Sequence, residues 1–241
     1  MDHELVQDAV ETMEGAGVVV RRLFPVVHCR HHDPFVLWDH FAIEAGTGFP
    51  EHPHRGFEAI TYLFDGGMEH ADNLGNRSVV HAGGAQRFTA GRGIRHSEMP
   101  VGGARGIQLW INLPQRLKSL PPDYQQVDAD ALPDRALTDG RLRTIVGAGS
   151  PLRLHTPVEY LDLALDSGGH YRHSPPPGFR GLVYLVQGAA EVNGHPLAEA
   201  QALFLPKATP LDIEACHPSR LMLAFGRPHG EAIHQHGSYV D

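Results

Sequence analysis

The two stretches of sequence that decide the fold are HPHRGFE at residues 52–58 and AGRGIRHSE at residues 90–98. Side chains two apart on a β-strand point to the same face, so His52 shares a face with His54, and His96 shares one with Glu98. Two neighbouring strands can therefore aim three imidazole rings and one carboxylate at a single point. Such a ligand set suits Fe, Mn, Ni, Cu or Zn better than Ca or Mg, because it is mostly nitrogen. The sequence thus predicts a metal site formed by His52, His54, His96 and Glu98.

Composition favours an all-β chain of ordinary globular character. Of the 241 residues, 41% are hydrophobic and 20% are charged, a balance typical of folded domains. The 27 glycines and 19 prolines recur at short intervals between apolar segments, which is the pattern of many short strands joined by turns. The length is enough for one large domain or two small ones.

Charge and hydropathy disfavour several function classes. The formal net charge is −8 and no cluster of Lys and Arg occurs, so we expect no direct contact with nucleic acid. No segment approaches the roughly 20 apolar residues of a membrane span, and the first residues lack the pattern of a signal peptide. Cys29 and Cys216 form no paired motif, so no disulfide framework is expected. These observations predict a cytoplasmic protein that does not bind membranes.

A weak internal repeat predicts two similar halves, because YLFDG at residues 62–66 returns as YLVQG at 184–188. The expected organisation is a leader that is loose or a short helix at 1–16, a metal-binding barrel at 17–113, a connector at 114–140 and a second barrel at 141–241. The repeat places Ser174, Pro176 and Arg180 where the first half has its two motif histidines and Glu58. None of the three is a good metal ligand, so the second barrel is predicted to be metal-free.

Several longer motifs resemble the pirin family of the cupin superfamily. They are GFPEHPHRGFE at 48–58, MEHADNLGN at 68–76, TAGRGIRHSEMP at 89–100, GIQLWINLP at 106–114 and QHG at 235–237. The resemblance implies a bicupin, with two tandem cupin-type β-barrels, minor helical content and an iron-type metal in the first barrel. It also implies that the metal ligands are His52, His54, His96 and Glu98. Glu58 matches a glutamate of the general cupin motif, and we expect it beside the ligands rather than on the metal.

The resemblance also implies a reaction. Four protein ligands leave up to two positions on an octahedral Fe(II), which allows a substrate and O2 to bind side by side. In the pirin family this arrangement implies a quercetin or flavonol 2,3-dioxygenase, which opens a small aromatic enol-ketone with O2 and releases carbon monoxide. We expect Glu98 to act as general base as well as ligand. The expected cofactor is one divalent metal ion, Fe(II) first, with Mn, Ni, Cu or Zn as alternatives.

A different class of function stays open at this point. Some pirins resemble non-catalytic regulators, in which the redox state of the metal changes a surface that binds a transcriptional or metabolic protein partner. The two functions differ in access to the metal. A pocket of about 300–1,000 Å³ that opens onto the metal favours an enzyme, whereas a closed site beside an exposed patch favours a regulator. A purely structural zinc barrel is disfavoured, because such sites prefer thiolates.

Overall fold

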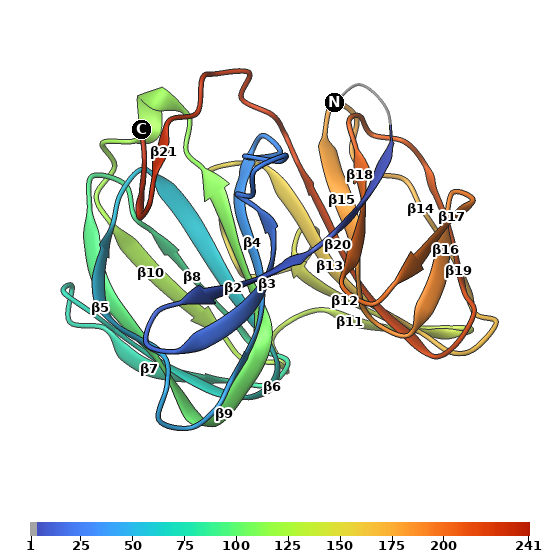
Figure 1. Ribbon diagram of the computed structural model, residues 1–241, viewed down its shortest axis with the longest axis horizontal. Coiled ribbons are helices and arrows are strands. Elements are labelled where there is room, and N and C mark those ends of the chain that lie inside the picture. Colours follow the sequence, from blue (N-terminus) through green and yellow to red (C-terminus); the bar gives the residue numbers. More distant parts are fainter. Residues whose placement is uncertain (1–3) are drawn as a thin grey trace. The chain divides into compact units, whose positions relative to one another are not determined.

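The computed structural model describes residues 4–241 and consists almost entirely of antiparallel strands (Figure 1). The all-β prediction is confirmed, and the only helical element among these residues is one 3-10 turn, η1 (Gln115–Leu117). Contacts divide the chain into two units. The first unit comprises Val10–Ala131, Leu154–Thr156 and His229–Asp241, and the second comprises the chain up to Ala9, Leu132–Arg153 and Pro157–Pro228.

The first unit is built on a nine-stranded sheet with the order β10-β8-β6-β9-β4-β3-β2, in which β5 also pairs with β9 and β7 with β6. Its strands are β2 (Val10–Glu14), β3 (Val18–Phe24), β4 (Phe35–Ile43), β5 (Phe49–His54), β6 (Phe57–Asp72), β7 (Arg77–His81), β8 (Ala85–Thr89), β9 (Ile94–Asn112) and β10 (Asp123–Val127). A short hairpin of β21 (Gln235–His236) and β22 (Tyr239–Val240) completes this unit.

The second unit contains a seven-stranded sheet, β1-β18-β15-β20-β13-β12-β11, and a four-stranded sheet, β14-β19-β16-β17. Its strands are β1 (Leu5–Asp8), β11 (Asp134–Leu137), β12 (Gly140–Val146), β13 (Val158–Leu165), β14 (His170–His173), β15 (Arg180–Gln187), β16 (Ala189–Val192), β17 (His195–Ala198), β18 (Gln201–Leu205), β19 (Leu211–Ala215) and β20 (Ser219–Gly226). A continuous cluster of buried Leu, Val, Ile, Ala and Phe side chains forms its core.

The segments expected to be a leader and a connector are used as sheet edges instead. β1 pairs with β18 and β2 pairs with β3, so the described part of the expected leader is neither loose nor helical. Likewise β10 extends the sheet of the first unit beyond β8, and β11 extends that of the second beyond β12. Edge strands need only one bonded partner, and they tolerate polar and irregular sequence that gives a weak pattern.

The two longest strands, β6 and β9, pair along most of their length and bend together. The pairing shifts register near Gly66. Gly66 has a φ of +74°, and a Cβ built on it would lie 2.1 Å from the carbonyl oxygen of Gly103. Only glycine permits this close approach of two backbones at a positive φ. On β9, Gln108 lies within hydrogen-bond reach of Glu98, ten residues earlier in the same strand, and donates to it.

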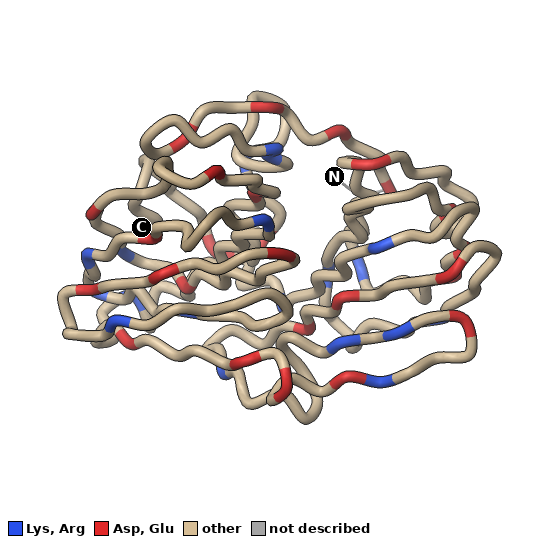
Figure 2. The backbone as a smooth tube through the Cα atoms, turned by 90° about the horizontal axis from the view of Figure 1, so that it is seen from below, with Lys and Arg blue, Asp and Glu red and all other residues tan. Residues whose placement is uncertain are grey.

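Charges of both signs are interspersed along each unit, and no long stretch carries a single sign (Figure 2). Within residues 4–241 no helix has the length and apolar character needed to cross a membrane.

Candidate metal centre

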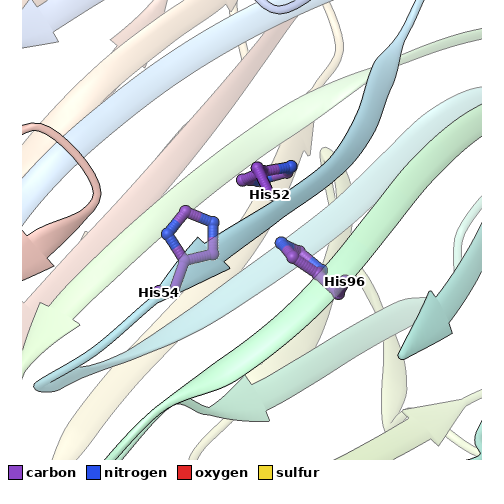
Figure 3. A group of neighbouring side chains, drawn as sticks. All are labelled: His52, His54 and His96. Atoms are coloured by element: carbon purple, nitrogen blue, oxygen red, sulfur yellow. The ribbon is translucent and has the colours of Figure 1, made fainter. Parts of the chain in front are cut away.

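Three histidine rings converge inside the first unit (Figure 3). His52 and His54 lie on β5, and His96 lies directly opposite His52 on the neighbouring β9. Their potential ligand atoms all lie within 4.8 Å of one another. His54 and His96 are buried, whereas His52 is partly exposed. The structure therefore brings together three of the four residues expected to bind the metal, and these three could hold an ion.

Hydrogen bonds at Nδ1 leave the opposite nitrogen of each ring for the site. The Nδ1 atom of His52 lies 2.7 Å from the carbonyl oxygen of Pro50, and that of His54 lies 3.3 Å from the carbonyl oxygen of Ser238. A carbonyl only accepts, so both rings carry their proton on Nδ1 and present an Nε2 lone pair. The Nε2 atom of His96 is buried and has no hydrogen-bond partner within the described chain. Three imidazole nitrogens facing one point fit a transition-metal ion.

The electrostatics of the site also fit metal binding. Burial lowers the pKa of His54 to about 3, and the neighbouring His96 and His52 add to the shift. Burial likewise lowers the pKa of His96 well below its ordinary value, again with help from His52. Both rings are therefore neutral near pH 7, which is the form that coordinates metals.

Glu98 is buried in the same unit, but it is not part of the group of three histidines. Its Oε1 accepts hydrogen bonds from the Thr61 hydroxyl at 2.8 Å and from Gln86 Nε2 at 2.7 Å. Its Oε2 accepts one from Gln108 Nε2 at 2.6 Å. The carboxylate is thus held by three donors, while Oε2 retains a lone pair.

The two amides that hold Glu98 are themselves oriented by aromatic side chains. Trp110 Nε1 donates to Gln108 Oε1 at 3.1 Å, which turns the Gln108 amide nitrogen toward Glu98. In the same way the Tyr124 hydroxyl donates to Gln86 Oε1 at 3.1 Å. Fixed donors of this kind hold a carboxylate in one place.

Strand register sorts the side chains around the site into two rows. Residues directly opposite on adjacent strands share a face. One set of opposite residues, the polar row, runs across six strands as Arg22, Asp39, Gln108, Thr61, Gln86 and Gln126. The next set, the apolar row, runs across five strands as Leu37, Trp110, Ala59, Phe88 and Tyr124. The ring of His54 stacks on Phe88 and meets Trp110 edge to face.

A cavity of about 530 Å³ opens beside the histidines. Its lining includes His52 and His54, Leu37 and Trp110 from the apolar row, and Asp39 and Gln108 from the polar row. Arg22 also lines it and binds both carboxylate oxygens of Asp39, at 2.7 and 2.6 Å. Burial raises the pKa of Asp39 to about 6, although Arg22 opposes the shift. The cavity thus offers one apolar and one hydrogen-bonding wall.

The segment at residues 229–241 forms part of this site. Its Gln235, Gly237 and Ser238 line the cavity. The Nζ of Lys118 anchors it by donating to the Val240 carbonyl at 2.7 Å. Arg55 pairs with the side chain of Asp241 at 2.7 Å. The carbonyl that orients His54 therefore belongs to a firmly attached hairpin.

Glu58 does not lie beside the metal ligands, so that expectation is wrong. Its carboxylate accepts hydrogen bonds from the backbone N–H groups of His155 and Thr156 and from the hydroxyl of Thr89. Strand alternation explains the difference, since its neighbours Phe57 and Ala59 carry the face that packs near His54. Glu58 points to the other face and ties residues 154–156 to β6.

Arg95 points away from the site, as strand alternation predicts, and pairs with Glu51 at 2.8 Å. The residues that sequence reasoning missed are the partners of the ligands. Thr61 and Gln86 lie in no recognised motif, and Gln108 lies in one, at 106–114, that gave it no role. The three become a group only when the register of the strands is known. His70 lies within a motif of the pirin resemblance, but its position behind His96 could not be derived from spacing.

Two family models of known proteins match parts of this chain. The family model described as "Pirin" matches residues 17–111, and the model described as "Pirin C-terminal cupin domain" matches residues 160–241. Together they span more than half of the chain. The chain belongs to the pirin family.

Individual members of the pirin family support the assignment. A pirin-like protein of Caulobacter vibrioides is 34% identical over 95% of this chain and 88% of its own length. The crystal structure of a quercetin 2,3-dioxygenase from Acinetobacter baumannii is 28% identical, with a TM-score of 0.89, and covers 98% of this chain and 90% of that one. The bacterial pirin YhhW of Escherichia coli, solved in complex with nickel(II), is 25% identical, with a TM-score of 0.77. The match covers 94% of this chain and 99% of that one.

Proposed function

We propose that this pirin is a metal-dependent dioxygenase that cleaves flavonol-like substrates, as a quercetin 2,3-dioxygenase does. The observation that carries the proposal is the cavity of about 530 Å³, because it reaches two of the three histidines. This volume lies in the range of about 300–1,000 Å³ that is typical of small-molecule sites. The similarity to a solved quercetin 2,3-dioxygenase supports the same activity.

In this proposal His52, His54 and His96 hold one divalent metal ion, Fe(II) first, and Glu98 is the fourth ligand through the free lone pair of Oε2. The bound metal would bring an enol-type substrate and O2 together. Both oxygen atoms of O2 enter the products and one ring carbon leaves as carbon monoxide, so no external reductant is needed.

The cavity walls suit a flat aromatic molecule with several hydroxyl groups. Leu37 and Trp110 provide the surface for the rings, and Asp39 and Gln108 provide hydrogen-bond partners for the hydroxyls. Glu98 is the proposed acceptor of the enolic proton. Because Gln108 lines the cavity and also holds Glu98, substrate must displace this contact before the proton reaches the carboxylate.

The test is a turnover assay on protein stripped of metal and reloaded anaerobically with Fe(II). With quercetin, we expect O2 uptake matched by carbon monoxide release. His96→Ala should lose both metal and turnover, whereas His217→Ala, at an exposed position in the second unit, should keep both. Glu98→Gln should lose turnover if Glu98 is the base.

Two results would contradict the proposal. Full metal content in His96→Ala would remove His96 from the ligand set. No turnover by protein shown to carry Fe, Mn, Ni or Cu would favour the alternative, a non-catalytic pirin that acts as a redox-sensitive regulator of a protein partner.

A further inference from the structure

A fourth histidine lies directly behind one of the three candidate ligands. His70, on β6, is fully buried, and its Nδ1 lies 3.4 Å from Nδ1 of His96. On its other side, Nε2 of His70 lies 3.1 Å from Oδ2 of Asp72, whose side chain is also fully buried. His70 is not part of the group that could hold the metal. The three side chains form a line from Asp72 through His70 to His96.

Asp72, the last residue of β6, is fixed by hydrogen bonds from the turn that follows the strand. Its Oδ1 accepts the backbone N–H groups of Leu74 and Asn76, and its Oδ2 accepts the side-chain amide of Asn76. In every one of these contacts the Asp72 carboxylate is the acceptor. Tyr124 stacks on the His70 ring with centroids 4.1 Å apart and planes 14° apart, which fixes the ring orientation.

Hydrogen-bond roles along this line follow from Asp72. A carboxylate accepts, so His70 carries its proton on Nε2. A neutral imidazole has one proton, which makes Nδ1 of His70 an acceptor. His96 must then donate from Nδ1, and its Nε2 is left with a lone pair.

We propose that Asp72 and His70 are positioning residues that set the tautomer of His96 and so aim its Nε2 lone pair into the metal site. The inference rests on the proposed metal site but not on the proposed reaction. Outer partners that orient a ligating histidine typically change metal affinity about 10- to 100-fold when they are removed.

The opposite arrangement is unfavourable in this structure. If His70 donated to His96, the His96 proton would sit on Nε2, which is buried and has no acceptor within the described chain. A buried N–H without a partner costs about 1–3 kcal/mol, and the ring would offer the metal no lone pair. His52 and His54 differ from His96, because the partner of Nδ1 in each is a backbone carbonyl. A carbonyl can only accept, so no side-chain substitution reverses the tautomer of these two rings.

The direct test is the tautomer itself. In metal-free protein labelled with ¹⁵N-histidine, two-bond ¹H–¹⁵N correlations distinguish the two neutral tautomers, and His70→Leu and His96→Ala identify the signals. We expect the proton of His96 on Nδ1 and that of His70 on Nε2. A His96 proton on Nε2 would overturn the proposal.

The second test is nickel(II) affinity measured by competition with a chelator. Asp72→Asn places an amide donor against His70, which forces both rings to reverse, so we expect at least a tenfold weaker affinity and a reversed His96 tautomer. The matched control is Asp65→Asn, also on β6, where the exposed side chain accepts a hydrogen bond from the Gly66 N–H. The nickel(II) affinity of this control should lie within threefold of that of the parent protein.

A pair of substitutions at His70 keeps the proposal testable if Asp72→Asn does not fold. A glutamine amide can still donate to Asp72 and accept from His96, so His70→Gln should retain affinity within threefold. His70→Leu cannot accept and should lose at least tenfold. Equal affinities for these two variants would contradict a positioning role, whatever the result of the quercetin assay.

Discussion

Single residues show where sequence reasoning succeeds and where it ends. The histidines could be predicted because strand side chains alternate with a period of two, which puts His52 and His54 on one face. Their partners could not be predicted, because the carbonyl that orients His54 is 184 residues away in the chain and His70 is 26 residues from His96. Spacing tells which face a residue takes, but not what lies opposite.

Burial of neutral histidines gives the metal-free protein a pH-dependent stability. The pKa of His54 is about 3 in the folded state, below its ordinary value of 6.5. Between these values the unfolded chain binds more protons, so the free energy of unfolding falls as the pH is lowered from about 6.5 toward 3. At about 1.4 kcal/mol per pKa unit, we expect the contribution of His54 to the free energy of unfolding to fall by a few kcal/mol by pH 4, while Asp39, whose pKa burial raises to about 6, changes it in the opposite direction.

Urea unfolding of the metal-free protein at pH 7.5, 6, 5 and 4 measures this loss. His54→Gln removes one of the titrating rings and should make the profile less steep over the same range, while His96 still contributes. A variant profile as steep as that of the parent protein would show that His54 is not the source.

At the scale of elements, the strands near the motifs were predictable and the sheet edges were not. The segments of β6, β8 and β9 carry alternating or apolar runs bounded by turn residues. The strands β1, β2, β10 and β11 are short and polar. The pairing of β1 with β18 and of β10 with β8 depends on edges supplied by distant parts of the chain, whereas β2 and β11 pair with the next strand in sequence. The same limit applies to the polar row, which exists only through the register of six strands.

The bend shared by β6 and β9 should be highly sensitive to substitution of Gly66. Gly66→Ala combines a positive φ with a clash against the Gly103 carbonyl, and we expect destabilisation of at least about 3 kcal/mol. Gly75→Ala is the matched control, because Gly75 has a similar φ of +92° and no atom within 4 Å of the added Cβ. It should cost only about 1–2 kcal/mol.

Chemical denaturation of both variants separates the two contributions. The difference between their free energies of unfolding reports the close approach of β6 and β9 alone. Similar losses of free energy of unfolding in both variants would mean that the strands can move apart without cost.

At the scale of the whole molecule, two units share an all-β architecture but differ in what fills them. The second unit has a continuous apolar cluster, whereas in the first unit two smaller apolar clusters lie among buried polar and histidine side chains of the site. The prediction that the second half holds no metal stays a prediction. The pirin resemblance indicated the bicupin fold, but strand pairing decides that β1 joins the second unit and residues 229–241 join the first.

Metal binding should therefore protect the first unit selectively. A ligand that binds only the folded state stabilises it by about 2.7 kcal/mol at a hundred times its dissociation constant. With nickel(II) added, we expect slower hydrogen exchange in β5, in residues 94–98 and in the β21–β22 hairpin, and little change in β18. Equal protection of β18 and β5 would contradict a site confined to the first unit.

The carbonyl of Ser238 that orients His54 has a consequence for how the protein matures in the cell. The ribosome must add a further 184 residues after His54 before this acceptor exists. A nascent chain can form much of the surrounding barrel earlier, since domains fold as they emerge. The imidazole gains its final orientation only when residues 235–240 have left the exit tunnel, so the proposed metal site is completed late in biosynthesis.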